Sequence, residues 1–551
     1  MENALLLAAV CLSALTVLLC LISKGQKYAN IIKILWGLVV TFIIIDMGML
    51  IYYLITSNFS YCYVYNHTDN SLDLVYRISA LWSGQEGSFL LWGACLAVIG
   101  IFVLLEKGKN SKRVFGAYAL ICLSIFIACY ISKPFARMDI TPLNGIGMAQ
   151  ALKDPWMVVH PPLIFIAYSL MAVLAVQSVA LSKESEKSMI ERIQKWVRLS
   201  WVFLGLGIFT GSIWAYRALG WGGYWSWDPI ENTALVPWLI MCGYMHKKEK
   251  ISISKCVLPF IIACFGTFLT RSGILNERSA HAYTQGNILI SVIILGLIFC
   301  AACWIALSKL KGIQKNKTRN ITGFFKDTKQ VFCHIINFYA LLIFLGTMAP
   351  LITGVNTPTK FYMIISIIFS LLYVTLLLVR DIKTLSKKNL WMMVISTIIV
   401  IAVAFISETT NYAGLLFMWA CLMPPSLWIA SRFKSHNWRY YLLHIGMILM
   451  IVGITTSSYL GKDSYAISQL SNTSFSISGN NIATSDIMKQ SSITASSLTC
   501  DVLIDCSKAI SMQNGSIRIP YTTKPLIILF WIGGFLTILS PCVMGIKKKH
   551  D

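Results

Sequence analysis

The chain has 551 residues, of which 56% are hydrophobic and only 13% are charged. Soluble globular domains carry about 25% charged residues, so this composition excludes an ordinary soluble protein, a disordered chain and a disulfide scaffold. The formal net charge of +23 would suit nucleic-acid binding if the basic residues formed one surface. They fall instead in short clusters between apolar runs, which favours one polytopic membrane domain.

Fifteen apolar runs of roughly the length that spans a bilayer core follow one another along the chain. They lie at 4–22, 34–55, 88–105, 114–131, 162–181, 199–216, 229–246, 256–270, 286–307, 333–353, 361–379, 390–406, 412–430, 441–460 and 525–545. We therefore predict an all-α multi-pass membrane protein with about 15 transmembrane helices. The predicted domains are a helical membrane domain over 1–460, a small outer domain over 461–524, and a last helix with a basic tail over 525–551.

The basic residues predict the orientation of these helices. With Met1 outside, the inside loops hold 33 of the 46 Lys and Arg residues. The positive-inside rule then places the N-terminus outside and the C-terminus inside a bacterial cytoplasmic (inner) membrane. The first apolar run lacks a preceding basic region and is followed by a basic loop, so we expect a retained helix and not a cleaved signal peptide.

The outer segment 461–524 is rich in Ser and Asn, and its modest alternation of apolar and polar residues favours a small β-rich domain. Cys500 and Cys506 lie in this segment. The sequence leaves open whether they form a disulfide.

The segment 214–238 concentrates aromatic residues more than any other part of the chain. It contains five of the 17 tryptophans, Trp214, Trp221, Trp225, Trp227 and Trp238. An interfacial aromatic belt, the alternative interpretation, would spread such residues over many helix ends. Here they share one loop with three glycines, which permit close backbone approach and suit a flat aromatic ligand. Asp228 and Pro229 fit the N-cap and first residue of the next helix.

Two pairs of histidines suit haem ligation, which requires neutral imidazoles on the two sides of the iron. His160 and His281 stand at the outer starts of predicted helices, level with the tryptophan-rich loop, although a lone interfacial histidine is the common alternative. His246 lies about 26 Å along its helix from the outer surface, by helix rise. His444 enters its helix from the inside, so these two fit a second porphyrin near the inner face, with His334 as an alternative ligand.

The remaining histidines, His67, His436 and His550, are expected to be solvated. Asp46 is an acid in the middle of a predicted helix, where a charge costs at least about 2.5 kcal/mol. It is either a protonated acid hydrogen-bonded to a neighbouring helix or a proton acceptor near a quinol.

Residues 221–232, which read Trp-Gly-Gly-Tyr-Trp-Ser-Trp-Asp-Pro-Ile-Glu-Asn, resemble the WWD signature of haem-handling proteins in cytochrome c maturation. Within that superfamily the chain is similar to the CcmF family of haem lyase subunits. Further similar segments are 82–88, 154–162, 266–273, 345–350 and 444–446. The relatives CcmC and CcsA carry the loop too, but CcmC is shorter and lacks the second histidine pair. The chain departs from typical CcmF in being shorter, mainly after residue 460.

The resemblance implies a holocytochrome c synthase-type haem lyase with two haem sites. His160 and His281 would ligate a transient outer haem, and His246 and His444 the iron of a stable haem b. The implied platform for the outer haem consists of Trp221, Tyr224, Trp225, Trp227 and Asp228. Candidate contacts for the haem propionates, since a guanidinium binds a carboxylate bidentately, are Arg77, Arg217, Arg271 and Arg278. Each of these arginines is equally consistent with an ordinary interfacial charge.

The implied partners are the haem chaperone CcmE, a CcmH-type thiol subunit and an apocytochrome c that presents Cys-x-x-Cys-His. Haem b is then the expected electron relay, with quinol as a candidate donor. Two alternatives are a respiratory haem-b subunit, which leaves the tryptophan-rich loop unexplained, and a haem transporter or exporter. The latter would need polar residues along a path across the membrane, and Asp46 is the one acid found in mid-helix.

Overall fold

The computed structural model describes residues 2–22, 27–108, 110–178, 186–218, 223–246, 253–275, 279, 281, 290–298, 300, 328–381, 394, 397–401, 418–425, 438–469, 474–477, 480–483, 492–512 and 516–544. The chain divides into two units. Unit 1 comprises Met1–Gly211 and Trp227–Pro358, and unit 2 comprises Ser212–Ser226 and Thr359–Asp551. The boundary between the units therefore falls within the tryptophan-rich segment.

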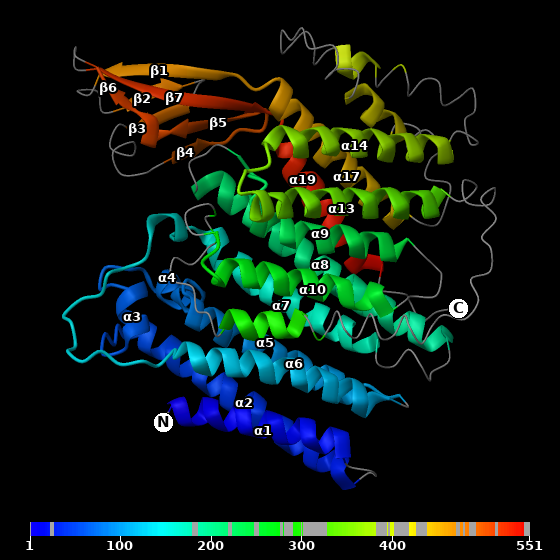
Figure 1. The fold of residues 1–551 in the computed structure, drawn as a ribbon. Coiled ribbons are helices and arrows are strands. Elements are labelled where there is room, and N and C mark those ends of the chain that lie inside the picture. The colour runs from blue at the N-terminus through cyan, green and yellow to red at the C-terminus, as the bar shows by residue number, and fades with distance from the viewer. Residues whose placement is uncertain are drawn as a thin grey trace. The chain divides into compact units, whose positions relative to one another are not determined.

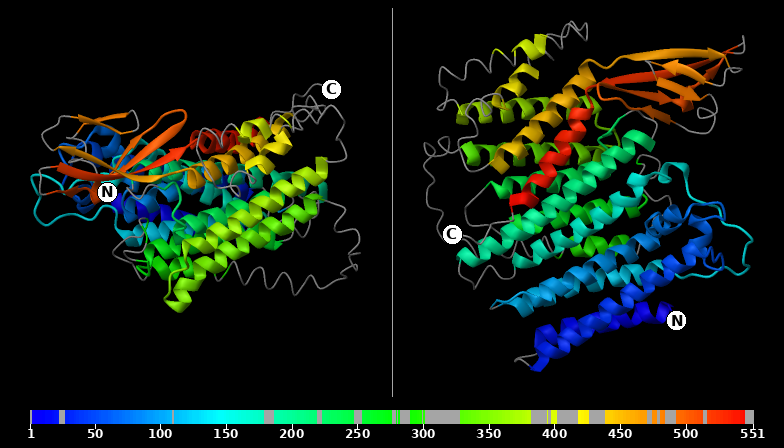
Figure 2. Two further views of the ribbon diagram at one scale, coloured as in Figure 1. Left: turned by 90° about the horizontal axis from the view of Figure 1, so that it is seen from above. Right: turned by 180° about the vertical axis from the view of Figure 1, so that it is seen from behind.

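Unit 1 is built from long apolar helices that lie side by side, joined by shorter helical turns (Figures 1 and 2). Its helices are α1 (Glu2–Ile22), α2 (Lys27–Ile55), α3 (Cys62–His67), α4 (Leu74–Ser79), η1 (Ala80–Trp82), α5 (Gln85–Leu105), α6 (Ser111–Ser132), η2 (Gln150–Leu152), α7 (Pro155–Gln177), α8 (Glu186–Ala218, in this unit to Gly211), α9 (Pro229–Met245), α10 (Ile253–Arg271) and α13 (Thr328–Thr353). Helix α1 packs on α2 and α6, α5 packs on α2, α6 and α7, and α10 packs on α7 and α9, which in turn contacts α13.

Two Asp-Pro pairs fix the starts of α7 and α9. The carboxylate of Asp154 accepts a hydrogen bond from the backbone N–H of Trp156 at 2.9 Å. The carboxylate of Asp228 accepts one from the backbone N–H of Ile230 at 2.7 Å. Each aspartate is the N-cap, and the proline after it occupies the first helical position, where no N–H is needed. The predicted cap at Asp228 is confirmed.

Unit 2 contains the helices α14 (Thr359–Asp381), α17 (Trp438–Tyr459) and α19 (Ile528–Met544). Helices α17 and α19 pack closely because glycines face the contact. A Cβ on Gly446 would lie 2.6 Å from Oγ1 of Thr537, and one on Gly533 would lie 2.5 Å from the Gly446 carbonyl oxygen. Small residues of this kind are typical where helices approach each other within a membrane.

A small β-sheet connects α17 to α19. Its strands are β1 (Asp463–Gln469), β4 (Ser492–Ala495), β5 (Cys500–Asp505), β6 (Ile510–Ser511) and β7 (Ser516–Pro525), while β2 (Ser474–Ile477) and β3 (Asn480–Ala483) form a separate hairpin. The order is β1-β7-β5-β4, all neighbours are antiparallel, and β6 pairs with β7. The predicted strands of this segment are present. Cys500 and Cys506 are free thiols, so they form no disulfide in this structure.

Ten helices of the described residues are long and apolar enough to cross a membrane. Helices α9 and α19 have 17 residues each and coincide with two further predicted runs. The runs predicted at 286–307, 390–406 and 412–430 fall in large part outside the described residues. The chain is thus a multi-pass membrane protein with a small C-terminal domain, as predicted.

Candidate functional site

The second half of the tryptophan-rich loop is fixed to unit 1 by a buried asparagine. Trp227 has φ +61°, a left-handed conformation that costs a non-glycine residue about 1–2 kcal/mol and persists only where its surroundings impose it. The side-chain amide of Asn232, in the first turn of α9, donates to the Trp227 carbonyl oxygen at 3.0 Å. The same amide donates to Oγ1 of Thr347 in α13, also at 3.0 Å. Asn232 therefore ties the loop to two helices, a role that the sequence did not reveal.

Asp228 is both the cap of α9 and the charge partner of His281. Its Oδ1 lies 3.9 Å from Nδ1 of His281, and the side chain of Asp228 is only 7% exposed. Burial lowers the pKa of His281, but the nearby carboxylates of Asp228 and Glu231 outweigh burial, so the net pKa is raised. Burial raises the pKa of Asp228, but the nearby His281 and the hydrogen bond from the Ile230 N–H help to outweigh burial, and this pKa is lowered. Carboxylates placed in this way orient metal-ligating histidines in other proteins.

His160 lies in the second turn of α7 and fits against two glycines of α8. Its Nδ1 is 2.7 Å from the Gly207 carbonyl oxygen. Because a carbonyl oxygen can only accept, Nδ1 donates, and Nε2 is then the unprotonated nitrogen of the neutral ring. A Cβ on Gly211 would lie 2.6 Å from Cε1 of His160, so a larger residue would displace the ring. The glycines at 207 and 211 therefore create the space that the imidazole occupies.

Both predicted outer ligands, His160 and His281, belong to unit 1. Nε2 of a neutral imidazole is the form that ligates iron, so the hydrogen bond of His160 fits this use.

The arginines predicted to contact haem propionates differ in their surroundings. Arg271, at the end of α10, is buried, donates to Oγ of Ser88 at 2.8 Å and lies over the ring of Phe89 at 4.5 Å. The guanidinium of Arg77 instead donates to three backbone carbonyl oxygens, those of Ile55, Asn70 and Leu72. Arg217 is exposed in unit 2, and Arg278 lies outside the described residues.

The predicted aromatic platform is divided between the units. Trp227 and Asp228 belong to unit 1, while Tyr224 and Trp225 belong to unit 2, and Trp221 lies outside the described residues. The ring of Tyr224 packs on that of Phe530 with centroids 4.6 Å apart. Burial raises the pKa of Tyr224 to about 12.

The predicted inner ligands also belong to different units, so their pairing stays a prediction. His246, in unit 1, has its Nδ1 2.9 Å from the Cys242 carbonyl oxygen and packs against the ring of Phe332 at 4.7 Å. His444, in unit 2, is buried, and its ring lies parallel to that of Tyr373. His334, the alternative ligand, has an exposed side chain on α13.

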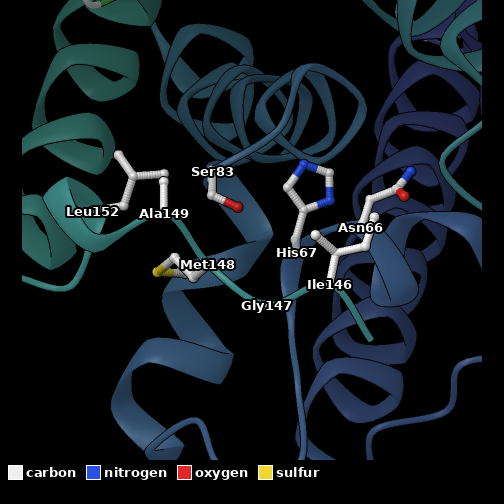
Figure 3. Close-up of a pocket in the computed structure, with 8 residues that line it drawn as sticks. All are labelled: Asn66, His67, Ser83, Ile146, Gly147, Met148, Ala149 and Leu152. Carbon is white, nitrogen blue, oxygen red and sulfur yellow. The ribbon is translucent and has the colours of Figure 1, made fainter. Parts of the chain in front are cut away.

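His67 was expected to be solvated, but it is half-buried and lines a pocket (Figure 3). Its ring stacks on Tyr63 at 4.2 Å, its Nδ1 lies 2.8 Å from the Tyr63 carbonyl oxygen, and burial lowers its pKa. The pocket has a volume of about 390 Å³ and is lined by Asn66, His67, Ser83, Ile146, Gly147, Met148, Ala149 and Leu152. The His67 ring occupies the space that a side chain at position 84 would fill, so a glycine is needed at this position of the 82–88 segment.

Asp46 is completely buried in α2. Among the described residues, neither of its carboxyl oxygens has a hydrogen-bond partner. The expected hydrogen bond to a neighbouring helix is therefore absent from that part of the chain.

Comparison with known proteins begins with a family model. The model of the family described as "Cytochrome C assembly protein" matches residues 82–275, a range that contains His160, Asp228 and Arg271. His281 lies just beyond it, and the C-terminal sheet lies far outside.

Curated relatives extend the similarity over more of the chain. The cytochrome c-type biogenesis protein NrfE of Haemophilus influenzae is 27% identical over 80% of this chain and 75% of its own length. CcmF of the same organism is 33% identical over 56% of this chain and 50% of its own length. CcmF of Escherichia coli K12 is 28% identical over 54% of this chain and 48% of its own length. The chain thus spans about half the length of these CcmF relatives.

A solved structure, the cytochrome c heme lyase CcmF, has the same fold, with a TM-score of 0.75. The match covers 99% of this chain and 97% of that chain at 18% identity. The chain thus has the multi-pass fold of that protein, and residues 82–275, which include the tryptophan-rich loop, match the cytochrome c assembly family. Together these similarities support a CcmF-type cytochrome c biogenesis protein.

Proposed function

We propose that the chain is the haem-binding membrane subunit of a haem lyase in cytochrome c maturation. It would hold haem at the tryptophan-rich loop while the two thiols of an apocytochrome Cys-x-x-Cys-His motif add across the haem vinyl groups. Each addition forms one carbon–sulfur bond, and the thiol proton goes to the other vinyl carbon. Haem supplies the iron and the vinyl groups, and the protein supplies position and electrostatics.

His160 and His281 are the proposed ligands of this outer haem. The hydrogen bond from Nδ1 of His160 to Gly207 supports the proposal, because it fixes the tautomer whose Nε2 can ligate. Asp228 is the charge partner of His281, with its Oδ1 3.9 Å from Nδ1 of that ring. Because the two imidazoles have different neighbours, Gly207 and Asp228, one can leave the iron while the other stays bound. This suits a protein that must receive haem and pass it on.

Arg271 is the favoured propionate contact among the four arginines. Ser88 and Phe89 hold its guanidinium in place, so little side-chain entropy remains to be lost on binding a carboxylate. The three carbonyl contacts of Arg77 favour a structural role for that residue instead.

The proposed resident cofactor is a haem b held by His246 and His444. The contact between Nδ1 of His246 and the Cys242 carbonyl oxygen leaves Nε2 in the ligating form. Within its own unit, each histidine has an aromatic neighbour, Phe332 for His246 and Tyr373 for His444. Bound there, haem b would supply one-electron chemistry, with quinol as the proposed donor. The two histidines would hold it within the membrane.

The proposed setting is a bacterial cytoplasmic membrane, with the N-terminus outside and the C-terminus inside. Proposed partners on the outer side are the haem chaperone CcmE, a CcmH-type thiol subunit and the apocytochrome. The 33 basic residues of the inside loops support this orientation.

The observation that carries the proposal is the placement of His160, His281 and Asp228 within one unit. Holocytochrome formation in cells that depend on this protein tests it. His160→Ala and His281→Ala should each abolish the covalent haem signal of the cytochrome, while His334→Ala, at an exposed position, should keep that signal. Normal maturation in both of the first two variants would contradict the proposal.

A further inference from the structure

The first half of the tryptophan-rich loop is tied to the C-terminal sheet by a buried hydrogen bond. The hydroxyl of Tyr216, in the last turn of α8, donates to Oδ2 of Asp501 in β5 at 3.0 Å. Both residues are only 4% exposed. The other carboxyl oxygen of Asp501 accepts from the backbone N–H of Ser497 at 3.2 Å. Burial raises the pKa of Asp501, and these two donors partly offset that effect, so the carboxylate depends on Tyr216 for compensation.

A second set of contacts holds Tyr224, at the C-terminal end of the first half of the loop. The ring of Tyr224 packs on Phe530 at 4.6 Å and meets Trp531 edge-on at 6.5 Å. The serines at 457 and 458, at the end of α17, partly offset the rise that burial causes in the pKa of Tyr224. Trp531 also meets the ring of Tyr216 edge-on at 5.3 Å. One aromatic side chain of α19 therefore contacts both tyrosines.

We propose that Asp501, Phe530 and Trp531 are positioning residues for the tryptophan-rich loop. They act through Tyr216 and Tyr224, which stand on the two sides of the glycines at 220, 222 and 223. Glycines increase the backbone conformational freedom of a loop. Restraints at the ends of the loop reduce the conformational entropy that is lost when it binds a ligand. The contacts with β5 and α19 limit that freedom, and they thereby set how firmly the loop holds its ligand. This inference rests on the proposed haem-binding function.

Positioning of this kind is reciprocal. If the sheet favours the ordered loop, then a ligand that orders the loop must stabilise the contacts of β5 by the same free energy. A partner protein that moves β5 would likewise weaken the hold on haem. This coupling gives the small outer domain a role in release of the haem, in addition to any surface that it offers to partners.

Hydrogen exchange of the purified full-length protein, with and without added haem, tests the proposal. Tyr216→Phe removes only the hydroxyl, while Asp501→Asn keeps an acceptor oxygen for it. Tyr216→Phe should speed exchange at the amides of 223–227 and weaken haem binding at the outer site, each about tenfold, since hydrogen bonds to charged groups carry that much. Asp501→Asn, which keeps the acceptor, should hold exchange and haem affinity close to those of the wild type, and neither variant should change the haem b absorbance.

Asp505→Asn is the matched control, because Asp505 lies on the same strand and pairs with Lys508 at the surface at 2.7 Å. It should leave loop exchange and haem affinity as in the wild type. Unchanged loop exchange in Tyr216→Phe would overturn the proposal, as would equally faster exchange throughout β5, β7 and α19. Exchange measured without haem tests only whether the Tyr216–Asp501 contact orders the loop. Failure of the wild-type protein to bind an outer haem would instead refute the proposed function.

Discussion

Gly211→Ala should disable the outer site without touching a proposed ligand. An added Cβ would lie 2.6 Å from Cε1 and 2.8 Å from Nδ1 of His160. Carbon atoms in contact are ordinarily about 3.5–4.0 Å apart. The ring must therefore move by roughly 1 Å, because the backbone of α8 is fixed by its own helical hydrogen bonds.

A shift of this size is enough to remove the hydrogen bond that fixes the tautomer. The distance from Nδ1 of His160 to the Gly207 carbonyl oxygen is 2.7 Å. A displacement of about 1 Å away from that oxygen exceeds the range of a hydrogen bond. Misplacement of a positioned group by about 1 Å can cost 10²-fold in rate, so we expect roughly a hundredfold loss of holocytochrome formation.

Gly48→Ala is the matched control, since a Cβ on this glycine of α2 would meet nothing within 4 Å. Alanine is the better helix former by about 0.5–1 kcal/mol, so neither variant should unfold for local reasons. The assay compares the yield of covalently haem-bearing cytochrome with the amount of inserted membrane protein. Wild-type yield in Gly211→Ala would refute the role assigned to His160.

Three further changes test other contacts. Asp228→Asn keeps a residue that caps α9 but removes one of the two carboxylates that raise the pKa of His281, so this pKa should fall, as measured by NMR titration of haem-free protein; an unchanged pKa would contradict the pairing. Asn232→Leu leaves the Trp227 carbonyl without its donor and should cost about 1–3 kcal/mol, seen as a lower Tm; an equal Tm would show that the loop does not need this tie. Asp46→Asn should slow quinol-dependent reduction of haem b at constant haem content if Asp46 takes up a proton, and equal rates would exclude that role.

The helices could be predicted from the sequence because each requires only local information. About 20 apolar residues must span the bilayer as a helix, since no other open structure satisfies the backbone there. The start of α9 was likewise predictable, because Asp228 caps the helix through the N–H two residues ahead. The strands of the C-terminal segment were suggested by alternation alone, and their order was not.

The contacts that build the site could not be predicted, because they join residues far apart in sequence. Tyr216 and Asp501 are 285 positions apart, and Asn232 and Thr347 are 115 apart. His67 shows the same limit, since its burial depends on the ring of Tyr63 and on the missing side chain of Gly84. A glycine or a polar residue beside a strong motif signals that a contact exists, but only the fold supplies the partner.

The absorption spectrum of the purified protein, compared among four single variants, tests the two-site account most directly. His246→Ala and His444→Ala should each remove a low-spin b-type absorbance, while His160→Ala and His281→Ala should keep it and lose only maturation. A haem exporter or a respiratory subunit would not separate the two pairs in this way. Retention of full haem b in both inner variants, or its loss in correctly inserted outer variants, would contradict the account.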